Sequence, residues 1–375
     1  MDERPWTEEE NLQTDRERAE KRKTVKKVFG RIALGLSGMI LVFSILLEFL
    51  APVILNSVPG GEGNINVVFV LSQLTLYSVG IITYLILNRW VPNAPTGRAL
   101  LPLAEPFGEE VLSDKGADPM GGLSRPRGLT LRTGGMLVAI CLALGFIFNL
   151  ITLGISYGIN LFNHAREVRE ITQQYLETGY GVIPEPPNFL EVDPLIEMVG
   201  GINPILSFLI VVVTTSVFEE MIFRKLLYDK LIVFGGKVYI IASSMLFALF
   251  HLNHRQLLYT FAVGVVFAGV MYYTKKVSYC IVLHMGFNSF GVLGLHIHGL
   301  PETIEMLYGI LFFGLVVTGM VFLVKGLLSA RRWATFEPAQ IEVKKKRDIF
   351  FNPGMIIFLI LSIGGMIGGA LYFSA

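Results

Sequence analysis

Long apolar segments alternate with short polar segments along almost the whole chain of 375 residues. Each apolar segment has roughly 20 residues, which is enough for an α-helix to cross a hydrocarbon core about 30 Å thick. We assign predicted helices to residues 31–55, 67–88, 134–160, 204–233, 237–253, 256–274, 277–297, 303–327 and 354–374. The pattern predicts an all-α fold, a polytopic transmembrane bundle of about eight or nine spans.

Composition agrees with this pattern. Hydrophobic residues make up 53% of the chain and charged residues only 16%, whereas an average soluble domain has about 25% charged residues. An ordinary soluble domain is therefore excluded. The net charge of +1 points to no particular partner, and we expect a lipid bilayer around the helices and no bound nucleic acid.

Lys and Arg are distributed unequally between the two predicted faces of the membrane. They are dense before the first span, in the 89–133 loop, after the sixth span and before the ninth. The 56–66 loop has no Lys or Arg, and the 161–203 loop has two against seven acidic residues. Basic loops usually face the cytoplasm, so we expect a cytoplasmic N-terminus and an external C-terminus. The charged first residues indicate no cleaved signal, and we expect a multi-pass protein of a bacterial cell membrane.

Other residues within the spans have structural interpretations. Cys141 and Cys280 both fall inside predicted helices, so we expect two buried thiols rather than a disulfide. Glycines spaced four apart in the last span predict a helix-packing face. These glycines are Gly364, Gly365, Gly368 and Gly369.

Charged side chains interrupt the fourth predicted span in the sequence FEEMIFR, residues 218–224. An ionisable group at mid-membrane costs about 2.5–3.5 kcal/mol on insertion scales, so such groups usually pair or face a cavity. Glu220 and Arg224 are four residues apart on one helix face, which predicts an ion pair. Glu219 is rotated about 100° from Glu220 and has no partner of this kind. We therefore expect Glu219 to serve as a general base.

Two later spans carry further polar side chains. Phe247 and His251 are four residues apart in the fifth span, and His284 and Asn288 are four apart in the seventh. Each pair therefore projects from one helix face. A carboxylate, two imidazoles and an amide can activate a water molecule and stabilise an oxyanion, with or without a metal ion.

The motifs EExxxR, FxxxH and HxxxN, in this order on neighbouring apolar helices, resemble those of the glutamate-type intramembrane endopeptidases. This family comprises the type II CAAX prenyl proteases and bacteriocin-processing proteins and is also called CPBP or Abi. The resemblance covers about residues 200–300, and all three motifs are intact at Glu219–Arg224, Phe247–His251 and His284–Asn288.

The resemblance implies a role for each motif residue. Glu219 and His251 would activate the attacking water, His284 and Asn288 would stabilise the oxyanion, and Glu220 and Arg224 would brace the site, with Phe247 as support. It leaves two mechanisms open. One uses a zinc ion held by Glu219, His251 and His284, and the other uses no metal. The substrate would be a peptide or a membrane protein.

This interpretation divides the chain into four parts. Residues 1–30 form a charged cytoplasmic arm, and 31–195 contain the first three spans with their loops. Residues 196–300 form the protease-like core with the motifs on the fourth, fifth and seventh helices. Residues 301–375 contain the last two spans.

Other functions compete with an intramembrane protease. A transporter or a non-catalytic scaffold could use the same residues as a proton relay or a structural lock, in which case titratable groups should be spread along a path. A rhomboid-type string, GxSG, occurs at residues 35–38, but it lies far in sequence from the histidines. The metalloprotease string HExxH is absent from the sequence.

Helix lengths raise one difficulty. Counting about 1.5 Å per residue from the predicted cytoplasmic helix ends, His284 lies about 10 Å deep, while Glu219 and His251 lie about 20 Å deep. The sequence does not explain how these side chains would meet.

Overall fold

The computed structural model describes residues 8–57, 64–91, 129–186, 199–333, 336 and 339–374. Within these ranges the regular structure is helical and contains no strand, which confirms the predicted helical membrane bundle. Seven of the described helices are long and apolar enough to span a membrane, and two shorter apolar helices lie at Gly236–Phe250 and Pro353–Gly369. Most of the predicted 89–133 loop lies outside the described residues.

The first and last parts of the chain form long helices. The long helices are α1 (Glu8–Ser57), α2 (Ile65–Trp90), α3 (Leu131–Thr178), α11 (Glu302–Trp333) and α13 (Pro353–Ser374), and the four-residue α12 (Arg347–Phe350) precedes α13. The central part begins with a helix whose hydrogen-bonding pattern changes several times. Its segments are α5 (Pro204–Ser207), η3 (Phe208–Thr214), α6 (Thr215–Glu219), η4 (Glu220–Leu226), α7 (Leu227–Leu231) and η5 (Ile232–Phe234). Three uninterrupted helices follow, α8 (Gly236–Phe250), α9 (His254–Thr274) and α10 (Val277–His296).

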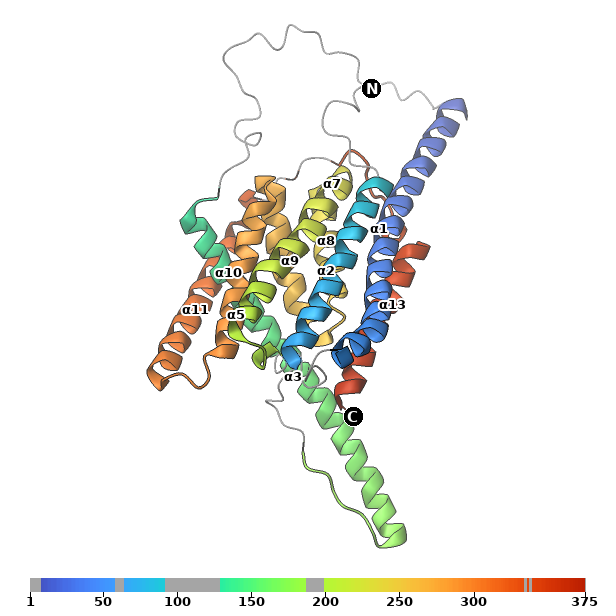
Figure 1. The fold of residues 1–375 in the computed structure, drawn as a ribbon. Helices are drawn as coiled ribbons and strands as arrows, with labels where there is room; N and C mark the ends of the chain where they lie inside the picture. The colour runs from blue at the N-terminus through green and yellow to red at the C-terminus, as the bar shows by residue number, and fades with distance from the viewer. Residues whose placement is uncertain are drawn as a thin grey trace.

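The helices stand side by side in a single bundle (Figure 1). α1 packs against α2 and α13, α3 packs against α9 and α11, and α8 packs against α9. α10 packs against the irregular helix at η3. α1 begins beyond one end of the bundle and α13 finishes at the other, so the described chain starts and ends at opposite ends (Figure 1).

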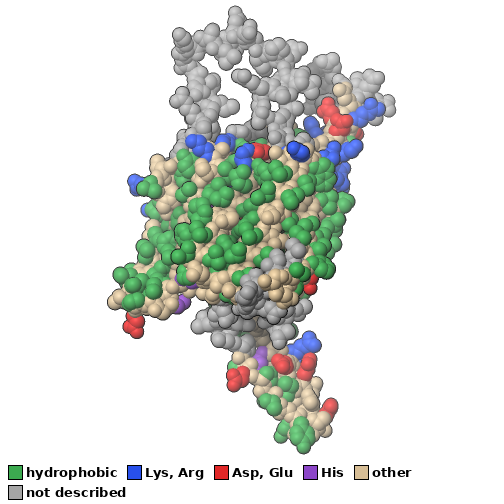
Figure 2. Space-filling view, in the orientation of Figure 1, with side chains coloured by type: hydrophobic (Ala, Val, Ile, Leu, Met, Phe, Trp, Pro, Cys, Tyr) green, Lys and Arg blue, Asp and Glu red, His purple; other side chains and the backbone are tan. Residues whose placement is uncertain are grey.

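The surface has the pattern expected of a membrane protein. Hydrophobic side chains cover the visible flank of the bundle, and Lys and Arg side chains gather near its upper end (Figure 2). The exposed apolar residues include Leu85 on α2, Ile155 on α3 and Leu311 on α11. Because such a surface is stable only in an apolar surrounding, it supports a multi-pass membrane protein.

The prediction of a loop at residues 161–203 is wrong for residues 161–178, because α3 continues as a helix to Thr178. Residues 161–178 contain many polar helix-forming residues and neither Gly nor Pro. Arg166 and Glu170, four residues apart, form an exposed ion pair at 2.9 Å. The helix ends where Gly179 adopts a left-handed conformation with φ 75°. The last turns of α3 project beyond the bundle (Figure 1).

The charged N-terminal part of α1 is attached to the segment that precedes α13. Arg22 binds the carboxylate of Asp348 through Nε at 2.9 Å and Nη2 at 3.2 Å, and Lys26 Nζ lies 3.7 Å from the same group. Asp348 itself is only 3% exposed. The hydrogen bond from Arg22 lowers the pKa of the Asp348 carboxyl below its ordinary value.

We expect Asp348→Asn to lower the melting temperature at pH 7. A lowered folded-state pKa stabilises the fold above the unfolded-state pKa, and this stabilisation is lost as the pH falls through the folded-state value. The difference in melting temperature between variant and parent should therefore shrink below about pH 4. Asp15→Asn is the control, since Asp15 pairs with Arg18 at an exposed site. An equal difference at pH 7 and at pH 3 would contradict the prediction.

Candidate active site

The site forms where the irregular helix meets α8 and α10. Two π-helical segments, Phe208–Thr214 and Glu220–Leu226, lie on either side of the short α6. Glu219 is the last residue of α6 and Glu220 is the first of the second π-segment. Their side chains differ in exposure, at 19% for Glu219 and 0% for Glu220. The exposed glutamate can therefore meet a substrate, while the buried one cannot.

Glu220 and Arg224 form the predicted ion pair, with Nε of Arg224 3.2 Å from Oε2 of Glu220. Both side chains are completely buried. Within the described residues the guanidinium nitrogens make no hydrogen bond of good geometry. Instead, Cζ of Arg224 lies 4.2 Å from the ring centroid of Phe247 and 5.4 Å from that of Phe267. Cation–π contacts of this kind are strongest where water is excluded.

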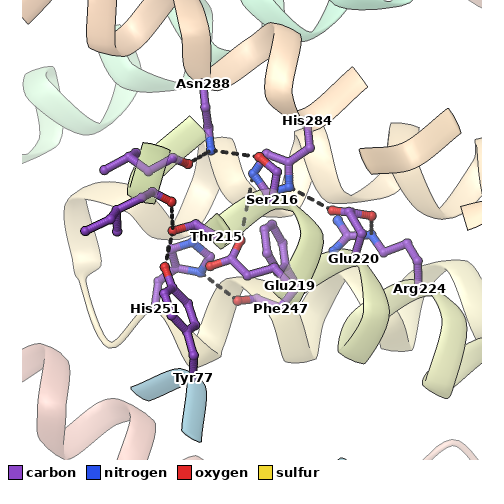
Figure 3. Close-up of polar contacts among 12 residues, drawn as sticks. Tyr77, Thr215, Ser216, Glu219, Glu220, Arg224, Phe247, His251, His284 and Asn288 are labelled. Atoms are coloured by element: carbon purple, nitrogen blue, oxygen red, sulfur yellow. Dashed lines mark hydrogen bonds and ion pairs between the residues drawn. The ribbon is translucent and has the colours of Figure 1, made fainter. Parts of the chain in front are cut away.

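His284 of α10 connects the two glutamates (Figure 3). Its Nδ1 atom lies 2.9 Å from Oε1 of Glu220, and its Nε2 atom lies 3.8 Å from Oε2 of Glu219. Because a carboxylate paired with Arg224 can only accept, Nδ1 of His284 carries a hydrogen atom and donates a hydrogen bond to Glu220. Glu220 thus orients the imidazole, and Nε2 is the ring atom directed toward Glu219.

His251 ends α8 on the other side of Glu219 (Figure 3). Its Nδ1 atom lies 2.8 Å from the carbonyl oxygen of Phe247. A carbonyl only accepts hydrogen bonds, so Nδ1 is the protonated nitrogen, and Nε2 of the neutral ring is left as a base. The ring also packs edge-on against Phe247 at 4.7 Å between centroids. Phe247 therefore supports both His251 and Arg224.

Asn288 is one turn beyond His284 on α10. Its Nδ2 atom donates to the carbonyl oxygen of Val211 at 3.0 Å and to Oγ of Ser216 at 3.4 Å. Val211 belongs to the first π-segment, and Ser216 is completely buried. One amide hydrogen of Asn288 is thus held by the Val211 carbonyl oxygen. The other makes only the longer contact with Ser216, so it can turn to a ligand.

Other polar side chains also satisfy carbonyl oxygens of the irregular helix. Ser243 donates to the carbonyl oxygen of Phe223 at 2.5 Å, and Tyr239 donates to that of Arg224 at 3.4 Å. In a membrane every backbone polar group needs a partner within the protein. The sequence did not identify Ser243 and Tyr239 as partners of these carbonyl oxygens. The one available signal was the presence of a Ser and a Tyr within an apolar helix.

Helix α2 also contributes to the site, a contact that the sequence analysis missed. Tyr77 and Thr215 are hydrogen-bonded through their hydroxyl groups at 2.5 Å. The Tyr77 ring packs against Phe218 at 5.0 Å between centroids. Phe218 also fills the space beside Gly80, where an added Cβ would lie 2.1 Å from its ring. The residue before Glu219 is thus held by α2.

The three predicted zinc ligands do not form a metal site in the described part of the chain. No group of three or more His, Cys, Asp or Glu side chains there is arranged to hold a metal ion. Glu220 and the Phe247 carbonyl bind Nδ1 of His284 and His251, as carboxylates and carbonyls usually bind the outer nitrogen of a metal-ligating histidine. Both Nε2 atoms and Glu219 remain as donors, so the zinc-dependent mechanism stays a prediction.

Two other sequence-based predictions can be compared with the structure. Cys141 and Cys280 are both free and buried, as expected. Ser37 of the GxSG string is buried on α1 and donates to the carbonyl oxygen of Ala33 at 2.8 Å. This hydrogen bond gives Ser37 a structural role in its own helix.

Residues 201–290 match the model of a family described as Type II CAAX prenyl endopeptidase Rce1-like. The matched segment is about a quarter of the chain, and this part is similar to the Rce1-like family. The match contains all three motifs and confirms the resemblance seen in the sequence. No curated protein and no solved structure gives a significant match to the chain.

The Rce1-like segment does not include every contact of the site. Tyr77 and Gly80 lie on α2, which precedes residue 201, and α13 follows residue 290. Helices outside the matched segment therefore pack against residues that adjoin the motifs, as α2 does at Phe218.

Proposed function

We propose that this protein is an endopeptidase that hydrolyses peptide bonds within the membrane by activating a water molecule with Glu219 and His251. The observation that carries the proposal is the different environment of the two adjacent glutamates. Glu220 is buried between Arg224 and His284, whereas Glu219 is partly exposed and faces Nε2 of His284 at 3.8 Å. The distance from Nε2 of His284 to Oε2 of Glu219 is too long for a direct hydrogen bond. His284 therefore does not bind the Glu219 carboxylate as it binds that of Glu220.

In the proposed reaction, the water molecule transfers a proton to Glu219 while its oxygen attacks the scissile carbonyl carbon. Nε2 of His251, left as an acceptor by the hydrogen bond at Nδ1, orients this water. The oxyanion receives hydrogen bonds from Nε2 of His284, when the ring carries both protons, and from the second amide hydrogen of Asn288. The oxyanion then re-forms the carbonyl as the C–N bond breaks, and Glu219 delivers its proton to the leaving amine nitrogen, which restores the Glu219 carboxylate.

For the substrate, we propose peptides of the CAAX type, processed from the cytoplasmic side. The family description supports this substrate class. The basic residues at one end of the bundle (Figure 2) support the cytoplasmic placement of that end. The proposal is tested with the purified protein in nanodiscs and a peptide with a prenylated cysteine three residues from its C-terminus. Release of the last three residues is expected, and failure to cleave both this peptide and an unprenylated one would contradict the proposal.

The competing proton-relay function has less support from the geometry. A relay requires titratable groups spread across the membrane, whereas Glu219, Glu220 and His284 gather at one point. Glu48, another acid in a predicted span, is exposed on α1. Convergence of the polar groups on one point favours catalysis.

We expect Asn288→Ala to lower kcat by about 10²–10³-fold while KM changes little, because loss of one oxyanion donor typically costs this much. Asn288→Asp should lower kcat further, since a carboxylate repels both the oxyanion and the Val211 carbonyl oxygen that Asn288 binds. Steady-state cleavage kinetics measure both variants.

A zinc-ligand role for Asn288 predicts the opposite order, because a carboxylate binds zinc at least as well as an amide. Metal content of each purified variant is therefore measured beside its activity. Full activity of Asn288→Asp would exclude the oxyanion role.

A further inference from the structure

The turn between α8 and α9 has an unusual backbone conformation next to His251. Leu252 has a φ of 52°, in the left-handed region that residues with a Cβ atom rarely adopt. The next residue, Asn253, is extended and caps α9 by accepting from the backbone of Arg255 at 2.8 Å. The left-handed residue allows the chain to reverse within three residues of His251.

The two backbone hydrogen bonds that begin this turn are long. The amide groups of His251 and Leu252 donate to the carbonyl oxygens of Ala248 and Leu249, each at 3.3 Å. Backbone hydrogen bonds usually have donor–acceptor distances of about 2.7–3.2 Å, so both of these bonds are longer than usual. Since an unfavourable backbone conformation persists only when its surroundings enforce it, side-chain packing must contribute.

That packing comes from the last helix, α13. A Cβ atom placed on Gly365 would lie 3.2 Å from Cβ of Leu252 and 3.3 Å from its Cδ2. The Leu252 side chain therefore rests directly on the bare backbone of α13. The neighbouring glycines differ, because a Cβ on Gly364, Gly368 or Gly369 would meet nothing within 4 Å in the described part of the chain. Of the four glycines predicted to form a helix-packing face, only Gly365 makes a close contact within the described residues.

The helix that carries Gly365 is itself firmly placed. A Cβ on Gly354, near the start of α13, would lie 2.0 Å from the carbonyl oxygen of Gly30 in α1. Phe358 and Met355 of α13 are buried in the core. α13 can therefore act as a fixed surface for the α8–α9 turn.

We propose that Gly365 is a positioning residue, which holds Leu252 in its left-handed conformation and thereby fixes His251 in the active site. This inference rests on the proposed function. It extends the functional unit beyond the Rce1-like segment, since α13 lies outside residues 201–290. The contact acts through the backbone of Leu252, one peptide bond from His251, so a small shift changes the direction of the imidazole.

The test compares Gly365→Val with Gly368→Val, an identical change on the same helix at an exposed glycine. Because a misplacement of about 1 Å can cost about 100-fold in rate, we expect Gly365→Val to lower kcat by about 10- to 100-fold with KM within about twofold. Gly368→Val should keep the parent values. The double variant Gly365→Val with Leu252→Gly should be no slower than Gly365→Val alone, because glycine removes the Cβ and Cδ2 atoms that the valine meets and adopts the left-handed conformation without strain.

Hydrogen exchange at residues 248–257 provides a readout that does not depend on turnover. Gly365→Val should speed exchange of the Leu252 and Asn253 amides, and Gly368→Val should not. Equal kcat values for the two valine variants, or unchanged exchange in Gly365→Val, would overturn the inference. If the parent cleaves nothing while Gly365→Val still alters exchange, the proposed function fails and the contact alone is established, which also removes the catalytic role of Gly365.

Discussion

Replacing Glu219 by Gln is expected to reduce peptide cleavage by about 10³-fold or more, because general-base catalysis typically contributes about 10²–10⁴-fold and an amide cannot accept the proton of water. The fold should survive, since the Glu219 side chain is partly exposed and Gln has the same shape. The purified variant and the parent are compared by initial cleavage rate and by melting temperature.

The control for this experiment is Glu48→Gln, an identical change at an exposed position of α1. It should leave both the rate and the melting temperature unchanged. Normal turnover by Glu219→Gln would rule out Glu219 as the base. If both the cleavage rate and the melting temperature fall, Glu219 is instead a structural residue.

The second large effect concerns stability. Glu220→Gln and Arg224→Gln should each lower the free energy of unfolding by about 3–5 kcal/mol, because each leaves an uncompensated charge in a completely buried site. The double variant should recover part of the loss, since no unpaired charge then remains. Thermal and denaturant unfolding in detergent measure the three variants.

Lys225 and Asp229 provide a matched pair on the same helix, also four residues apart but with side chains 40% and 27% exposed. Lys225→Gln should cost at most about 1 kcal/mol, as is usual for exposed pairs. If the effects of Glu220→Gln and Arg224→Gln simply add in the double variant, the two buried groups do not interact.

Comparing the activity and the stability of Glu220→Gln separates the effects of the two Glu220 contacts, one with His284 and one with Arg224. Gln can still accept the hydrogen bond from Nδ1 of His284 through its side-chain oxygen, but it carries no charge to balance Arg224. The variant should therefore lose stability more than activity. This pattern is the reverse of that expected for Glu219→Gln, although the two residues are adjacent in the chain.

Features that depend on a few neighbouring residues could be predicted from the sequence. The apolar segments predicted the helical bundle, because a span needs only length and composition. The spacing of Glu220 and Arg224 predicted their ion pair, because residues four apart lie on one helix face. The end of α3 was missed, since hydropathy does not show where a polar helix continues beyond the membrane.

The sequence by itself also determined which side chains are candidates for the chemistry, because charges and imidazoles are rare in apolar helices and their spacing sets the face from which they project. Only the tertiary structure decided how they meet. It brought His284 to Glu219 and Glu220 despite the difference in depth expected from helix lengths. It placed the Asn288 amide on the carbonyl of Val211 and the Leu252 turn on Gly365. These pairs are separated by tens of residues or more, so their contacts depend on the tilt, breaks and packing of whole helices, which no local pattern specifies.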